Sequence, residues 1–98
     1  MIEYLYDAIR TVAGQEARIN AYITDENENL ITEGCYFVLH DKAGTEMLLV
    51  KEGTYDEEFS TWEFVLAPED TKDLYGRYLY CIKHNDSTLC FKQPIYLM

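Results

Sequence analysis

The chain has 98 residues, which is enough for one small domain with a single core, and we expect that domain to fill residues 1–98. Hydrophobic residues make up 48% of the sequence and aromatic residues 14%, a composition that excludes an intrinsically disordered chain. The 8 basic residues against 18 acidic ones give a net charge of -10 without a basic cluster, which argues against nucleic acid or an anionic membrane as the partner.

No apolar stretch reaches the roughly 18 residues that a membrane-spanning helix needs. The segment Met1–Leu5 lacks the basic region and long apolar run of a secretory signal peptide. We therefore expect no membrane insertion.

Turn signals recur about every ten residues, and apolar and polar residues alternate between them, as strands with one buried face require. The pattern predicts seven strands at residues 3–11, 16–24, 34–40, 45–52, 58–66, 76–84 and 88–97. It favours an all-β, immunoglobulin-like two-layer β-sandwich of about seven antiparallel strands.

The strand pattern also predicts which side chains face the core, namely Ala17, Ile19, Ala21, Ile23, Cys35, Phe37, Leu39, Trp62, Phe64, Leu66, Tyr78, Tyr80 and Ile82. Outside the strands, Pro68 can begin a short helical turn over 68–73. Pro94 cannot donate to a ladder, which predicts that the last strand is an edge strand or breaks there.

A corner is predicted where the acidic turn 69–73 leads into the sixth strand. Gly76 permits an unusual backbone conformation, and Tyr78 can bury its ring while its hydroxyl reaches a backbone group of the preceding turn. A true immunoglobulin domain would add a cysteine on an early strand and a tryptophan on the third. Here Cys81 comes three residues after Tyr78 and Trp62 lies on the fifth strand, so only an immunoglobulin-like architecture is expected.

The three cysteines, Cys35, Cys81 and Cys90, are widely spaced and match neither a disulfide framework nor a zinc site. We interpret them as small buried hydrophobic residues. A single bridge between two of them stays open as an alternative.

The acidic segment 25–29 offers the alternating Asp and Asn oxygens of a calcium-binding loop. That motif also requires glycine at its sixth position and glutamate at its twelfth, where this chain has Leu30 and Tyr36. A turn is the better interpretation here and at Asp56–Glu58, and no metal or other cofactor is expected.

His40 and His84 are isolated in the sequence and lack the cysteine or carboxylate spacing of a metal site. No Ser or Cys is paired in the sequence with a base and an oxyanion hole. We therefore expect a protein that is not an enzyme.

Nine tyrosines are many for this length, and tyrosine suits interfaces because it offers a large contact area with a polar tip. Tyr22, Tyr36, Tyr55 and Tyr75 are the candidate interface residues. The alternative is that these tyrosines simply occupy strand positions where aromatic residues are favoured.

The order of several turn and strand signals resembles a known family. The signals are Gly14–Glu16, Asp25–Glu26, Gly34, the run 40–44, Asp70–Thr71, Leu74 and Gly76–Tyr80. The chain is similar to the immunoglobulin-like N-terminal domain of phage baseplate upper proteins. The resemblance implies an attachment module of a phage tail, located in the virion and made in the bacterial cytoplasm, which helps to hold the receptor-binding apparatus.

We therefore expect a non-catalytic docking module that binds other tail or baseplate proteins through sandwich edges and surface tyrosines, with self-association as a further candidate. The alternative is an immunoglobulin-like module on a bacterial cell surface that binds carbohydrate or protein ligands through Tyr and Trp side chains.

Overall fold

The computed structural model of the chain describes residues 3–5, 8–25, 27–85, 87–88 and 92–98. Its strands are β1 (Glu3–Leu5), β2 (Ala8–Thr11), β3 (Ala17–Ala21), β4 (Cys35–His40), β5 (Met47–Glu52), β6 (Thr54–Asp56), β7 (Thr61–Leu66), β8 (Gly76–His84), β9 (Ser87–Thr88) and β10 (Gln93–Leu97), with one short helix, α1 (Pro68–Thr71).

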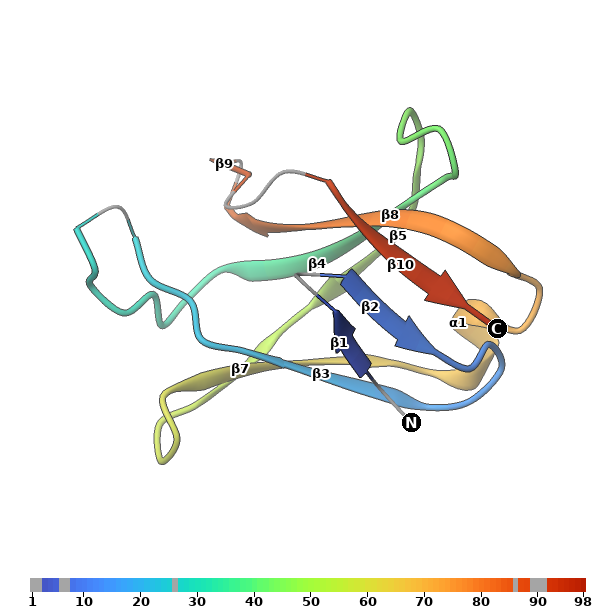
Figure 1. The fold of residues 1–98 in the computed structure, drawn as a ribbon. Coiled ribbons are helices and arrows are strands. Elements are labelled where there is room, and N and C mark those ends of the chain that lie inside the picture. The colour runs from blue at the N-terminus through green and yellow to red at the C-terminus, as the bar shows by residue number, and fades with distance from the viewer. Residues whose placement is uncertain (1–2, 6–7, 26, 86, 89–91) are drawn as a thin grey trace.

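The strands form two packed sheets (Figure 1). The larger sheet has the order β1-β2-β10-β8-β4-β5, with β9 paired to β8, and the smaller sheet has the order β3-β7-β6. The expected all-β, two-layer character is confirmed.

Three details of the expected strand pattern are wrong. The first predicted strand is a hairpin, because β1 pairs antiparallel with β2. The pairing of β2 with β10 is parallel, so the sheets are not wholly antiparallel. Strand β6 falls in a segment that the pattern left as a loop, because three residues are too few to show an alternation.

The core lies between the sheets and is built on a chain of aromatic rings. Tyr80 stacks on Phe37 with ring centroids 5.2 Å apart, and Phe37 reaches across to Phe64 of the smaller sheet at 6.1 Å. Phe64 in turn lies 6.3 Å from Trp62, and Trp62 lies 5.6 Å from Tyr55. The residues predicted to face inward are buried or half-buried.

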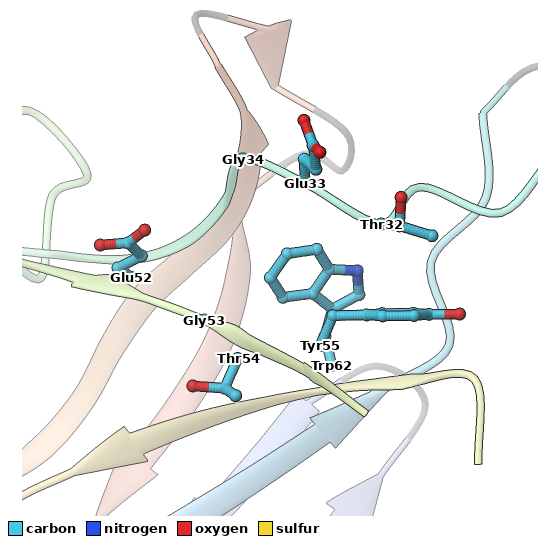
Figure 2. A pocket seen from close by; sticks show the side chains of 8 residues that line it. All are labelled: Thr32, Glu33, Gly34, Glu52, Gly53, Thr54, Tyr55 and Trp62. Carbon is cyan, nitrogen blue, oxygen red and sulfur yellow. The ribbon is translucent and has the colours of Figure 1, made fainter. Parts of the chain in front are cut away.

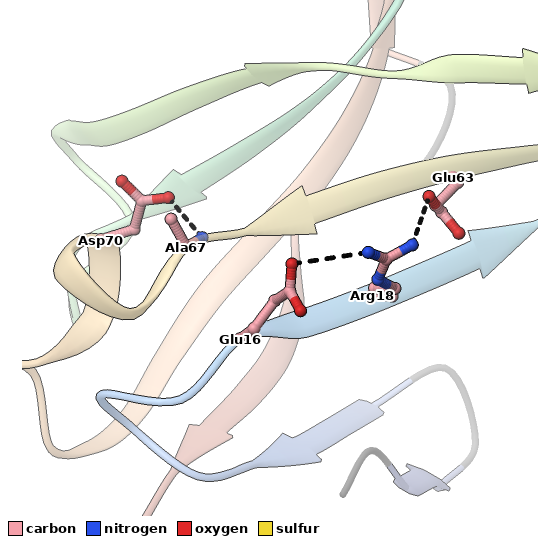
Figure 3. Close-up of polar contacts among 5 residues, drawn as sticks. All are labelled: Glu16, Arg18, Glu63, Ala67 and Asp70. Carbon is pink, nitrogen blue, oxygen red and sulfur yellow. Dashed lines mark hydrogen bonds and ion pairs between the residues drawn. The ribbon is translucent and has the colours of Figure 1, made fainter.

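Helix α1 begins at Pro68, as predicted, and it tightens the connection from β7 to β8. Ala67 N–H donates to the Asp70 carboxylate at 2.8 Å (Figure 3), which satisfies a donor at the start of the helix. Asp70 also forms an ion pair with Lys51 of β5 at 2.8 Å, and the buried Thr71 hydroxyl accepts a hydrogen bond from Gly14 N–H. Both contacts join α1 to distant segments of the chain.

Pro94 lies inside β10, which has partners on both sides, so β10 is not an edge strand. The pairing with β8 includes Pro94, whereas the pairing with β2 begins only at Ile95. The proline is tolerated because its missing N–H falls before the β2 ladder starts.

The corner before β8 has a glycine in the left-handed region and a buried tyrosine. Gly76 has φ +107°, and a Cβ there would lie 3.1 Å from the Lys42 ammonium nitrogen. Tyr78 is buried, and its hydroxyl accepts a hydrogen bond from Tyr75 N–H at 3.4 Å. The Lys42 ammonium group lies 5.4 Å from the centre of the Tyr78 ring, within range of a cation–π contact.

We expect Tyr78→Phe to lower the free energy of unfolding by about 0.5–1.5 kcal/mol, because it removes the acceptor of the Tyr75 N–H and leaves the buried ring in place. Tyr75→Phe is the matched control, since the Tyr75 ring is exposed. Urea denaturation of both variants measures the difference. Equal effects of the two changes would contradict a structural role for the Tyr78 hydroxyl.

Candidate protein-binding site

Among the described strands, β5 forms a free edge of the larger sheet. It pairs with β4 on one side and is the last strand in the sheet order. Three of its apolar side chains are unusually exposed: Met47 at 59%, Leu48 at 43% and Val50 at 50%. Edge strands of monomeric proteins are commonly protected by charges or proline. Residues 47–50 contain neither, and the charges of β5 lie only at its end, at Lys51 and Glu52.

The register shows which backbone groups of β5 point away from the sheet. Gly53 N–H donates to the Cys35 carbonyl at 2.9 Å, so Gly53 faces β4. Alternation then turns Lys51 toward β4 as well, and directs the N–H and C=O groups of Val50 and Glu52 to the open side. A bulge between Leu39 and His40 disturbs the β4–β5 ladder near the start of β5. The part of β5 that can pair regularly with a further strand therefore begins near Leu49.

The free edge of the larger sheet continues into that of the smaller sheet. Only Gly53 separates β5 from β6, and β6 is the last strand of the smaller sheet. Residues 49–56 thus form one extended stretch along the open side of the two sheets, which we call the β5–β6 edge.

A hollow of about 490 Å³ opens beside the β5–β6 edge (Figure 2). The rings of Tyr55 and Trp62 lie between the segments 32–34 and 52–54, and Glu33 and Glu52 stand on its rim. Trp62 is almost fully buried, and its indole N–H donates to the Ile31 carbonyl at 2.6 Å. The described residues that line it are Thr32, Glu33, Gly34, Glu52, Gly53, Thr54, Tyr55 and Trp62.

A second hollow, of about 590 Å³, adjoins the first and shares Thr54 and Tyr55 with it. Its remaining lining is Asn20, Asp56, Glu57, Glu58, Thr61 and Glu63. Glu63 is paired with Arg18 of β3 at 3.5 Å, and Arg18 also approaches Glu16 at 3.6 Å (Figure 3). None of the described residues that line the two hollows is basic.

The four candidate interface tyrosines do not form one surface. Tyr22 and Tyr55 lie at the same end of the smaller sheet, because Ala21, Trp62 and Tyr55 are in register. Tyr36 lies on β4, and Tyr75 precedes β8 at the end of the larger sheet farthest from Cys35. Tyr22 and Tyr75 are largely exposed, whereas Tyr36 and Tyr55 are half-buried.

The outward face of the larger sheet holds a buried histidine and a buried cysteine, where alternation alone would place exposed residues. His40 lies 3.4 Å from the Cys81 sulfur through its Nε2, and its Nδ1 is buried without a partner among the described residues. Val38 beside them is buried as well. Burial, and then the positive charges of Lys92 and Lys83, lower the pKa of His40.

Cys35 and Cys81 are both buried and are not joined by a disulfide, while Cys90 lies outside the described residues. Burial raises the pKa of the Cys35 thiol, which makes it a poor nucleophile. Within the described ranges, no three His, Cys, Asp or Glu side chains are grouped so that they could hold a metal ion.

We expect the buried His40 to make stability pH-dependent. His40 is neutral in the folded chain, whereas the unfolded chain binds a proton below about pH 6.5, so stability should fall as the pH drops from 6.5 toward the lowered pKa. The slope from this group is at most about 1.4 kcal/mol per pH unit. Urea denaturation between pH 5 and 8 of the wild type and of His40→Gln measures it. Both proteins keep His84 and all carboxylates, so identical slopes would show that His40 is not responsible.

The acidic segment that offered calcium ligands is a turn, as predicted. The Asp25 carboxylate accepts hydrogen bonds from Asn27 N–H at 2.8 Å and Asn29 N–H at 2.9 Å. The hydrogen bond from Asn29, followed by that from Asn27, lowers the pKa of Asp25. At the other predicted turn, Glu58 N–H donates to the Asp56 carboxylate at 2.9 Å. Both acids therefore serve to close their own turns.

No protein-family model, curated protein or solved structure matches the chain. No helix in the described part of the chain is both long enough and apolar enough to cross a bilayer.

The interpretation of the sequence missed this edge, although part of its signal was visible. Residues 47–50 are four consecutive apolar residues, a departure from alternation that can mark an exposed apolar strand or one buried on both faces. Only the sheet order decides between the two, because it leaves β5 with a single neighbour.

Proposed function

We propose that this domain is a non-catalytic docking module that binds a partner protein along the β5–β6 edge. The observation that carries the proposal is the unpaired edge of β5 with its exposed Leu48 and Val50. An extended segment of a partner can add to such an edge, with main-chain hydrogen bonds giving affinity and side chains giving specificity. The outward backbone groups of Val50 and Glu52 would make those hydrogen bonds.

We further propose that the two sheets have an immunoglobulin-like arrangement. The strand order β2-β10-β8-β4-β5 opposite β3-β7-β6, with β2 parallel to β10, supports it. The hydrogen bond of the Tyr78 hydroxyl at the corner is a second supporting feature. The setting in a phage tail baseplate, with other tail proteins as partners and the virion as location, is proposed from the family resemblance of the sequence.

A cell-surface module that binds carbohydrate through aromatic side chains has less support. Trp62 is 3% exposed, and its N–H is already bonded to the Ile31 carbonyl, so it cannot present a face to a sugar ring.

Binding of the purified domain to each protein encoded beside its gene tests the proposal. We expect a tail or baseplate protein among them to bind, and Val50→Lys to weaken this binding at least about tenfold, because a lysine on the edge opposes strand addition. Tyr75→Lys is the matched control, since Tyr75 is at least as exposed but lies far from the edge.

Three results would contradict the docking proposal or its setting. If no neighbouring protein binds, or if the neighbouring genes are not phage genes, the baseplate setting is wrong. If Tyr75→Lys abolishes binding while Val50→Lys does not, the contact site lies elsewhere.

A further inference from the structure

We infer that the partner segment of the β5–β6 edge is basic at one end, with a Lys or Arg side chain that enters the hollow beside Tyr55. This inference rests on the proposed docking function and specifies the chemistry of the partner. It combines the path of the edge, the charges around it and the shape of the hollow.

The side chains on and beside the β5–β6 edge change from apolar to acidic along its length. The β5 half begins with the half-buried Leu49 and the exposed Val50, whereas the part beyond Gly53 adjoins two hollows with six carboxylates: Glu33, Glu52, Asp56, Glu57, Glu58 and Glu63. A strand laid beside residues 49–56 would therefore meet apolar side chains first and carboxylates afterwards.

Within the described part of the chain, Glu33 and Glu52 have no ion-pair partner of their own. Both are exposed on the rim of the first hollow, and none of the described residues that line the two hollows is basic. Their charges are thus uncompensated locally, which leaves a region of negative potential that favours a cation.

The interior of the first hollow suits the body of a long basic side chain. Its walls include the half-buried Tyr55 ring, which can contact the methylene groups of Lys or the plane of an Arg guanidinium. The hydroxyls of Thr32 and Thr54 lie beside it as hydrogen-bond acceptors. A volume of about 490 Å³ accommodates such a side chain.

Charge also argues against a second copy of this chain as the occupant. Each copy carries a net charge of -10, so two copies repel each other as they approach. A basic segment of another protein removes this repulsion.

Synthetic ten-residue peptides with a common alternating Thr-Val body provide the test. One peptide carries two lysines at its amino end, one carries two at its carboxyl end, and one carries two glutamines instead. In about 50 mM salt we expect one lysine peptide to bind the wild-type domain about tenfold more tightly than the glutamine peptide, and the advantage to shrink as salt is added.

Two variants localise the effect. Glu33→Gln/Glu52→Gln should reduce the lysine preference to less than about threefold. Glu69→Gln/Asp73→Asn, which removes two exposed charges outside both hollows, should retain the preference.

The possible failures are distinguishable from failure of the docking proposal. Equal binding of the lysine and glutamine peptides would overturn the basic partner and leave edge docking in place. If the lysine preference survives Glu33→Gln/Glu52→Gln, or if both double variants reduce it equally, the lysine side chain does not bind in the first hollow. A concentration-dependent dimer abolished by Val50→Lys would make a second copy the occupant. If no peptide binds, the inference is wrong, and the Val50→Lys experiment with neighbouring proteins decides the docking function separately.

Discussion

Phe37→Ala is expected to lower the free energy of unfolding by about 3–5 kcal/mol, the largest effect of any single substitution considered for this protein. Phe37 is fully buried at the centre of the aromatic chain, where it stacks on Tyr80 and contacts Phe64 of the opposite sheet. Removing the ring loses its burial and leaves a cavity. The two sheets are held in place by their other contacts, so they cannot fully close it.

A loss of this size is comparable with the whole stability of many small domains, so Phe37→Ala can prevent folding altogether. Phe37→Leu keeps most of the apolar volume and should cost clearly less, which keeps the effect measurable by urea denaturation. Phe59→Ala is the matched control, because Phe59 is 69% exposed in the turn before β7 and should change stability by less than about 0.5 kcal/mol. Similar losses for Phe37→Ala and Phe59→Ala would contradict the assigned core.

The second large effect is expected for Gly53→Ala, which should destabilise the domain by about 1–3 kcal/mol. An added Cβ would lie 2.5 Å from Cε1 of Phe64 and 2.8 Å from Cε3 of Trp62, distances that real Cβ atoms do not show. Both rings are held by the core, so neither can move away cheaply. At an unstrained position the same change would instead stabilise by about 0.4–1 kcal/mol, so the sign of the effect tests the close approach.

Thr54→Ala is the control for Gly53→Ala, since Thr54 is the next residue and is exposed. Denaturation monitored by Trp62 fluorescence measures both variants, because Trp62 lies against the substituted position. A Gly53→Ala variant as stable as the wild type would show that the β5–β6 junction does not pack on these rings as described.

The two-layer all-β character was predictable because alternation of apolar and polar residues is a local property of a strand. The inward positions on β3, β4 and β7 followed directly from it. The helical start at Pro68 was predicted for a different reason, the preference of proline for the first helical position. The limits of the strands were predictable only where the alternation was long. Strand β8 matches its predicted range of 76–84, whereas the three-residue β6 showed no pattern at all.

The candidate site was only partly predictable. Tyr55 was among the expected interface residues, and it lies in both hollows. Its neighbours in the first hollow include Glu33 and Glu52. These two come from segments about twenty residues apart and share no sequence signal. Trp62, by contrast, was correctly expected to face the core.

The sequence by itself determined that this chain forms strands, which faces of them are apolar and where most turns fall, because these depend on neighbours within a few residues. Only the tertiary structure decided which strands pair, that β2 runs parallel to β10, and that Val38 and His40 are buried on the outward face. The same holds for the free β5–β6 edge and the acidic hollows beside it. Which strands pair and which side chains are buried depend on residues far apart in the chain. No local sequence pattern shows that these residues come together.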